Sequence, residues 1–180
     1  MDTPFLTTMA RGVGSHGIRV VRFEFPYMAA RRSGGKRGAP DREAVLLQSW
    51  RDVIAELGGG ERVVIGGKSM GGRMASMVAD EQHVRGLVCL GYPFHPPNQP
   101  LKTRTAHLAA LHTPTLIIQG TRDMFGTRDD VSAYQLAPAV RIEWLEDGDH
   151  SFKPRAASGF TEKGHLAQAV ALAAAFVTSV

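Results

Sequence analysis

The sequence has a single cysteine and lacks any long apolar run. These two features exclude an intrachain disulfide and a membrane-spanning helix. Cys89 is the only cysteine among 180 residues, so no intrachain disulfide can form. No apolar stretch reaches the length that a membrane-spanning helix needs. The first residues, Met1 to Pro4, lack the basic segment followed by an apolar one that marks a secretory signal. We therefore expect a cytoplasmic protein without a membrane partner.

The excess of basic over acidic residues is small. The chain has 21 basic and 17 acidic residues, a formal net charge of +4. Much of the excess lies in the segment Arg31–Arg37, which glycine and serine interrupt and in which no aromatic residue is interleaved. A nucleic-acid site would repeat the charge along one face of an element. We interpret the segment as a solvated, mobile loop and expect no nucleic-acid partner.

Apolar periodicity predicts one α/β domain that covers residues 1–180. Hydrophobic residues make up 43% of the chain, enough for a substantial core. Strands are expected at 18–25, 62–65, 84–90, 115–119 and 141–145, and helices at 5–13, 41–57, 70–80, 104–111, 131–136 and 166–177. This alternation predicts a three-layer sandwich, a mostly parallel sheet of about five strands flanked by helices.

The stretch Gly67-Lys68-Ser69-Met70-Gly71 has the G-x-S-x-G spacing of a nucleophile elbow. It follows an apolar, β-branched run and precedes a helical pattern. In such a turn the serine takes a strained backbone conformation that lifts its hydroxyl clear of the sheet. The glycines two positions before and after Ser69 would leave room for the strand and helix to cross. The Met70 N–H, at the helix N-terminus, would help to bind an oxyanion.

Two other interpretations of this stretch were weighed. Gly67-Lys68-Ser69 contains the G-K-S of a phosphate-binding loop, but that motif needs a glycine five positions earlier, where Arg62 stands. The stretch could also be a glycine-rich turn with an idle serine. The residues at the ends of the other strands decide against that second interpretation.

An acid and a histidine follow the next strand ends in the order that the elbow architecture requires. Asp123 comes after the fourth expected strand and His150 after the fifth. Because the carboxyl ends of parallel strands share one edge of the sheet, we expect both side chains near Ser69. His150 would take the Ser69 proton as general base, and Asp123 would hold the tautomer of His150.

Other acids and histidines fit these roles less well. Asp147 and Asp149 are too close in sequence to His150 to support it from another strand end, and Asp129 lies too far past its strand. The remaining histidines show no metal-ligand spacing, so we expect no metal site and interpret them as surface or supporting residues. His95 is the exception to follow, because its loop leaves the third expected strand at the edge of the site.

Four separated motifs stand out: G-G-K-S-M-G-G-R at 66–73, L-G-Y-P-F-H-P-P at 90–97, Q-G-T-R-D at 119–123 and D-H-S-F-K-P at 149–154. Together they resemble the small α/β-hydrolases related to dienelactone hydrolase. More narrowly, they are similar to the group that includes testis-expressed and nonspecific-lethal chromatin-complex subunit relatives. The resemblance implies a triad of Ser69, Asp123 and His150 and no cofactor, and some members of the group act as complex subunits.

The chain departs from this family at its beginning. Members start with additional strands, the last of which ends in an H-G-A-G-like turn that gives the other oxyanion donor. This chain starts where that turn should finish, at Met1–Phe5. We therefore expect an N-terminally shortened version of a longer protein. If the short form is genuine, the strand at 18–25 must pair directly with the elbow strand, and Met70 would be the only strong donor.

These observations predict a cofactor-independent serine hydrolase that cleaves a small ester or related acyl substrate through a covalent acyl-enzyme. The activity would be weakened if one oxyanion donor is missing. The alternative is a binding or complex subunit with a vestigial triad. The short loop Gly91–Thr103 predicts an open acyl pocket without a large lid. The sequence indicates no particular oligomeric state.

Overall fold

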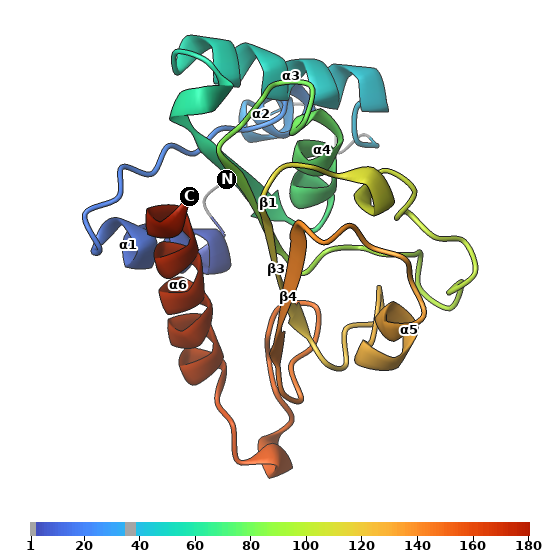
Figure 1. The fold of residues 1–180 in the computed structure, drawn as a ribbon. Coiled ribbons are helices and arrows are strands. Elements are labelled where there is room, and N and C mark those ends of the chain that lie inside the picture. Colours follow the sequence, from blue (N-terminus) through green and yellow to red (C-terminus); the bar gives the residue numbers. More distant parts are fainter. Residues whose placement is uncertain (1–2, 35–38) are drawn as a thin grey trace.

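The computed structural model describes residues 3–34 and 39–180, and in these residues four parallel strands form one sheet (Figure 1). The strands pair in chain order, each with the next along the sequence. The expected α/β class with a parallel sheet is therefore confirmed. The strands are β1 (Val64–Lys68), β2 (Gly86–Leu90), β3 (Thr115–Gly120) and β4 (Val140–Leu145).

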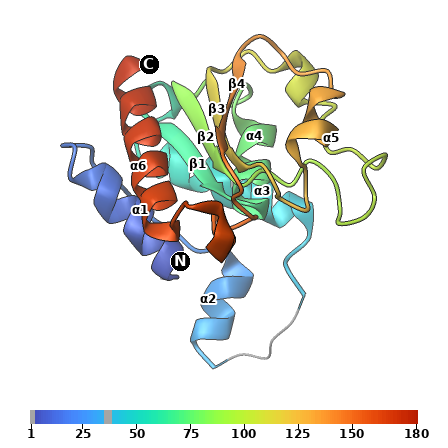
Figure 2. The same cartoon turned by 90° about the horizontal axis from the view of Figure 1, so that it is seen from below.

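Helices cover both faces of the sheet, which gives the expected three layers. Figure 2 shows α1 and α6 together on one face, with α4 and α5 on the other. The side chains of α3 pack with those of α4 in one apolar cluster. The helices are α1 (Pro4–Gly14), α2 (Pro26–Arg32), α3 (Glu43–Glu56), α4 (Met70–Val78), α5 (Arg128–Ser132) and α6 (Glu162–Ser179).

The two central strands divide their side chains between two cores. In β2, Leu87 and Cys89 join the cluster on the α3–α4 face, whereas Val88 and Leu90 join the cluster on the α1–α6 face. Successive side chains of a strand point to opposite faces, and a strand covered on both faces is apolar throughout. The continuous apolar run of β2 is therefore explained by its position inside the sheet.

The expected strand at 18–25 is wrong. Residues 18–25 belong to no strand, and β1 pairs with β2 as its described neighbour. Val20 and Val21 are 41% and 47% exposed, while the ring of Phe23 lies 4.7 Å from that of Trp50 in α3. The β-branched pattern reflects an extended segment that is anchored by aromatic packing at its end, without a strand to pair with. The pairing with the elbow strand considered above is absent from the described residues.

The segment after this run is helical where we expected a loop. Pro26 begins α2 at the first helical position, which its fixed φ favours. Arg31 and Arg32 form the last turn of this helix, and Arg32 pairs with Glu24. The first part of the expected basic loop is therefore ordered, and residues 35–37 of that loop lie outside the described residues.

Two of the shorter expected helices also differ. The segment 104–111 forms only a 3-10 turn at Leu108–Ala110, because a segment this short gains little from helix propensity. The helix expected at 131–136 instead covers Arg128–Ser132. It starts earlier because Thr127 and Asp130 form a reciprocal capping box at its N-terminus.

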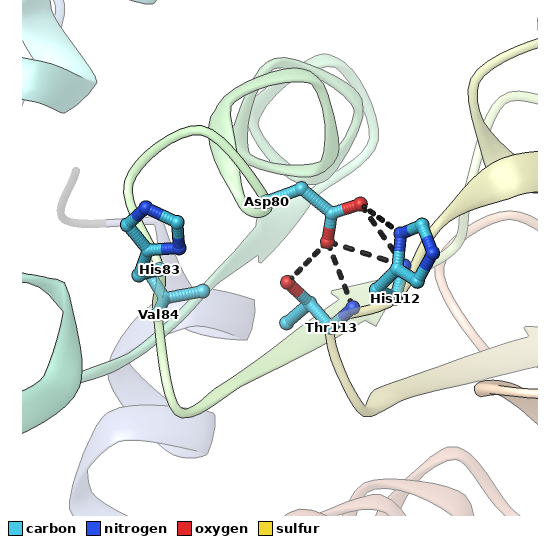
Figure 3. Close-up of a pocket in the computed structure, with 5 residues that line it drawn as sticks. All are labelled: Asp80, His83, Val84, His112 and Thr113. Carbon is cyan, nitrogen blue, oxygen red and sulfur yellow. Dashed lines mark hydrogen bonds and ion pairs between the residues drawn. The ribbon is translucent and has the colours of Figure 1, made fainter.

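At the amino ends of β2 and β3, Asp80 ties the turn after α4 to the segment that leads into β3. Its carboxylate accepts hydrogen bonds from the N–H groups of His112 and Thr113 and from Thr113 Oγ1, the last at 2.6 Å (Figure 3). Burial raises the pKa of Asp80, but these hydrogen bonds and that of the His112 ring outweigh it and lower the pKa to about 2. The carboxylate therefore stabilises the native connection between α4 and β3.

We predict that Asp80→Asn lowers the free energy of unfolding by about 1–3 kcal/mol at neutral pH, because hydrogen bonds to a charged acceptor are lost. Folding lowers the pKa of Asp80. Its contribution to the free energy of unfolding is therefore complete above the unfolded pKa of about 4 and is lost as the pH falls toward about 2. Urea unfolding of both proteins at several pH values measures this difference. A difference that stays constant down to acid pH would contradict the prediction.

Candidate active site

Ser69 stands at the junction between β1 and α4 in a backbone conformation that is rare for a side-chain-bearing residue. Its φ and ψ are 52° and −121°. The Ser69 N–H continues the sheet ladder by donating to the Leu90 carbonyl at 3.0 Å, and α4 begins at the next residue, Met70. The chain thus changes from strand to helix within one residue, as the elbow spacing indicated.

Close contacts between β1 and α4 explain two of the glycines at this turn. A Cβ on Gly67 would lie 2.7 Å from the Gly71 carbonyl carbon, and a Cβ on Gly72 would lie 2.6 Å from the Gly67 carbonyl oxygen. A Cβ on Gly71 would meet nothing within 4 Å. The expectation that Gly71 makes room for the crossing is therefore wrong, and Gly72 does so instead.

Asp123 and His150 meet at the carboxyl edge of the sheet, beyond β3 and β4. His150 Nδ1 lies 2.8 Å from Asp123 Oδ2, and the Asp123 side chain is completely buried, whereas that of His150 is 21% exposed. Because an ionised carboxylate only accepts hydrogen bonds, Nδ1 carries the proton and Nε2 is the basic nitrogen. The Phe125 ring packs on the imidazole with the ring centroids 4.4 Å apart.

Two residues that sequence reasoning missed hold this pair in place. Gln119 is buried at the end of β3, and its Nε2 donates to Asp123 Oδ2 at 2.9 Å. Its Oε1 accepts the Tyr92 N–H at 2.7 Å. Gly91 has a φ of 64°, and a Cβ there would lie 2.9 Å from the His150 carbonyl oxygen. A polar residue inside an otherwise apolar strand was the signal available for Gln119.

Lys68, the residue before Ser69, contacts the backbone of the loop that carries His150. Its Nζ donates to the His150 carbonyl oxygen at 2.9 Å and lies 4.9 Å from the centre of the Phe5 ring in α1. Burial lowers the pKa of Lys68, against the opposite effect of the Asp123 and Asp149 carboxylates. The lysine of the elbow therefore fixes the histidine loop and also links that loop to α1.

The other acids near the site bind parts of the chain other than His150. Asp147 pairs with Arg122 and Arg155. Asp149 Oδ1 accepts the Ser151 and Lys153 N–H groups and so closes the turn around the histidine. These bonds agree with our choice of Asp123 as the partner of His150.

His95, in the loop after β2, is buried and contacts the backbone and α5. Its Nδ1 lies 2.7 Å from the Pro96 carbonyl oxygen, and its Nε2 lies 3.5 Å from Asp130 Oδ2. These contacts join the loop after β2 to α5. His95 therefore supports the loop structurally.

A second serine–histidine contact lies nearby in α4. Ser76 Oγ is 2.8 Å from His107 Nε2, but it also lies 2.7 Å from the Arg73 carbonyl oxygen, in the pattern of a helix-interior serine. Tyr92 OH is 3.3 Å from the same His107 nitrogen. No carboxylate in the described part of the chain contacts the other nitrogen of His107. We interpret this cluster as a buried link between α4 and the loop after β2.

A cleft of about 200 Å³ opens beside Ser69. It lies where α4 begins and where the loops after β2 and β3 meet. A larger hollow of about 490 Å³ lies at the opposite edge of the sheet, around Asp80, His83 and His112 (Figure 3). The smaller cleft is the one that contains a candidate nucleophile. Its lining residues are Ser69, Met70, Arg73, Pro93, Arg104 and Phe125.

Within residues 3–34 and 39–180, no group of three or more histidine, cysteine, aspartate or glutamate side chains is arranged to hold a metal ion. No helix in the same residues combines the length and apolar character needed to cross a membrane.

A family model described as an alpha/beta hydrolase domain matches residues 1–178. An alpha-beta serine hydrolase homologue from Coxiella burnetii is 21% identical with a TM-score of 0.70, covering 100% of this chain and 77% of that one. Two Xanthomonas campestris proteins are also similar, one a putative hydrolase of the alpha/beta superfamily and the other an alpha/beta serine hydrolase without a lid.

The two Xanthomonas matches differ mainly in how much of the neighbour is covered. The putative hydrolase is 23% identical with a TM-score of 0.65, and the match covers 99% of this chain and 92% of that one. The serine hydrolase without a lid is 19% identical with a TM-score of 0.64, and the match covers 96% of this chain and 74% of that one. At these identities the likeness establishes the fold.

The contacts at the elbow predict different effects on stability when Gly71 or Gly72 is replaced by alanine. Gly72→Ala should lower the free energy of unfolding by about 1–3 kcal/mol, because the new methyl group would press on the Gly67 carbonyl. Gly71→Ala, the matched control, should be neutral or slightly stabilising, because it has free space and a better helix propensity. Chemical unfolding of both variants measures the effect, and equal losses of stability would contradict this account of the crossing.

Proposed function

The chain belongs to the alpha/beta hydrolase domain family, and from this membership we propose that it is a serine hydrolase whose triad is Ser69, His150 and Asp123. The observation that carries the proposal is the hydrogen bond between His150 and the buried Asp123. This pair lies beyond the carboxyl ends of the strands, where the strained turn at Ser69 also lies. A partly exposed histidine held by a buried acid is the arrangement that activates a serine hydroxyl.

In the proposed reaction, Ser69 Oγ attacks the carbonyl carbon of an ester while His150 Nε2 takes the hydroxyl proton. The ester C–O bond then breaks, and His150 returns the proton to the departing alcohol. Water next attacks the acyl-serine with His150 again as base, which releases the acid and restores the serine. Asp123 keeps the imidazole in the required tautomer and stabilises its charged form.

We propose the Met70 N–H as an oxyanion donor. Met70 is the first residue of α4, where N–H groups have no acceptor within the helix, and it lines the cleft beside Ser69. Losing one of two donors typically slows such reactions by about 100- to 1,000-fold. We expect slow turnover if Met70 is the only donor that the substrate meets.

A small carboxylic ester is the substrate class that we propose. The cleft is small, and the Xanthomonas neighbour that is described as lacking a lid has a similar fold. We also propose a relationship to dienelactone hydrolase, which the four motifs support, and a cytoplasmic location, which the composition supports.

Labelling with a fluorophosphonate probe tests the activated serine. We predict that wild-type protein is labelled, that Ser69→Ala abolishes labelling, and that Ser76→Ala retains it. Ser76 is the matched control because it lies in α4, the helix that follows Ser69, and also contacts a histidine. Asp123→Asn should slow labelling about a thousandfold or more, because the histidine would lose the partner that fixes its tautomer.

The labelling results distinguish a serine hydrolase from a binding subunit. Labelling that persists in Ser69→Ala would show that another residue is reactive. Absence of labelling in a folded wild-type protein would replace the proposed activity with that of a binding subunit.

A further inference from the structure

Phe125 lines the cleft beside Ser69 and also touches His150. Its ring lies against the imidazole, with the ring centroids 4.4 Å apart and the two planes inclined by 47°. Phe125 is half-buried and forms part of the cleft wall. One aromatic ring therefore joins the proposed general base to the space in which a substrate would lie.

Hydrogen bonds fix the backbone of Phe125 on both sides. Its N–H donates to Asp123 Oδ1 at 2.9 Å, and its carbonyl oxygen accepts the His95 N–H at 3.1 Å. These bonds connect Phe125 to the buried acid and to the loop after β2. A wall that is already ordered loses little conformational entropy when a ligand packs on it.

The chemistry of ester cleavage decides which part of a substrate would lie against this ring. His150 returns a proton to the departing alcohol, so the alcohol oxygen must come within hydrogen-bond reach of His150 Nε2. Phe125 packs on the same imidazole. The alcohol portion of the ester would therefore run along the Phe125 ring, while the carbonyl oxygen would point to the Met70 N–H.

Other lining residues of the cleft suit a flat aromatic group. Met70 and Pro93 are apolar, and a thioether makes favourable contacts with an aromatic ring. Arg104 also lines the cleft, and its guanidinium forms no ion pair within the residues that the structure describes. The face of an aromatic ring attracts a cation, whereas a saturated ring has no π electrons with which to do so.

The volume of the cleft limits the ligand to about one ring. The cleft measures about 200 Å³, and a cavity of about 150 Å³ is enough to bind benzene. A ring that fills this space would leave little room for the acyl group. The cleft therefore favours a short acyl group joined to an aromatic alcohol.

We propose that the substrates are esters of a short carboxylic acid with an aromatic alcohol, and that Phe125 selects them by packing on the ring of the alcohol. The inference rests on the proposed hydrolase function, because it places the scissile ester bond at Ser69. Hydrolysis follows the steps given above, consumes one water molecule and releases the short acid and the aromatic alcohol.

Three matched esters test this selection. Benzyl acetate carries its ring on the alcohol side, its isomer methyl phenylacetate carries the ring on the acyl side, and cyclohexylmethyl acetate has a saturated ring instead. Wild-type protein should hydrolyse benzyl acetate with a kcat/KM about three- to tenfold above that for cyclohexylmethyl acetate, because aromatic pairs gain energy beyond their buried area. It should also prefer benzyl acetate to methyl phenylacetate.

Variants of Phe125 separate substrate selection from support of His150. Phe125→Leu should remove the preference for benzyl over cyclohexylmethyl acetate, and Phe125→Tyr should keep it. If Phe125 only supported His150, Phe125→Leu would lower both kcat/KM values equally and leave their ratio unchanged, which would overturn the proposal. Phe160→Leu is the control and should retain the ratio, since the exposed Phe160 packs on another histidine, His165, with ring centroids 5.4 Å apart.

A binding measurement separates failure of this proposal from failure of the hydrolase function. Saturation-transfer NMR on Ser69→Ala protein should show transfer to the ring protons of benzyl acetate, and the added change Phe125→Leu should remove it. Such binding without hydrolysis of any ester would support the aromatic site and contradict the hydrolase. Hydrolysis of benzyl and cyclohexylmethyl acetate with equal kcat/KM, or absence of this binding, would overturn the aromatic site alone. A preference for methyl phenylacetate would overturn the placement of the ring on the alcohol side.

Discussion

The close crossing of β1 and α4 is the constraint on which the rest of the structure depends. The strand must end and the helix begin at Ser69, and the two backbones approach so closely that Gly67 and Gly72 have no room for a side chain. Cys89 of β2 lies beneath the same crossing, with its sulfur near Gly72. Burial raises the pKa of the Cys89 thiol, which marks it as a packing residue. A positive φ at a serine is costly, and this packing maintains it.

Most of the fold could be predicted from the sequence because local pattern and final environment agree. The apolar run of β3 is buried on both faces, and the helix expected at 5–13 forms as α1, with Thr3 as its N-cap. The strand expected at 18–25 shows the limit of this reasoning. A β-branched run indicates an extended conformation, but pairing requires a neighbouring strand, and that depends on residues far away in the chain.

The residues of the candidate site were easier to predict than the residues that hold them. Ser69, Asp123 and His150 follow strand ends, and in a parallel sheet these ends share one edge. The support of Asp123 by Gln119 depends on a buried amide with several partners, which no spacing in the sequence specifies. The role of Gly72 in place of Gly71 likewise depends on the direction that each position faces at the start of α4, since a Cβ on Gly72 would lie 2.6 Å from the Gly67 carbonyl oxygen and a Cβ on Gly71 would meet nothing within 4 Å.

The contact of Lys68 with both Phe5 and the His150 carbonyl has a consequence for the order of folding. The histidine loop is braced by an element from the start of the chain, by the elbow in the middle and by Gly91 after β2. Contacts between such distant segments pay the largest loop-closure entropy and form late. The sheet can therefore assemble before the histidine is positioned, so that docking of α1 completes the site.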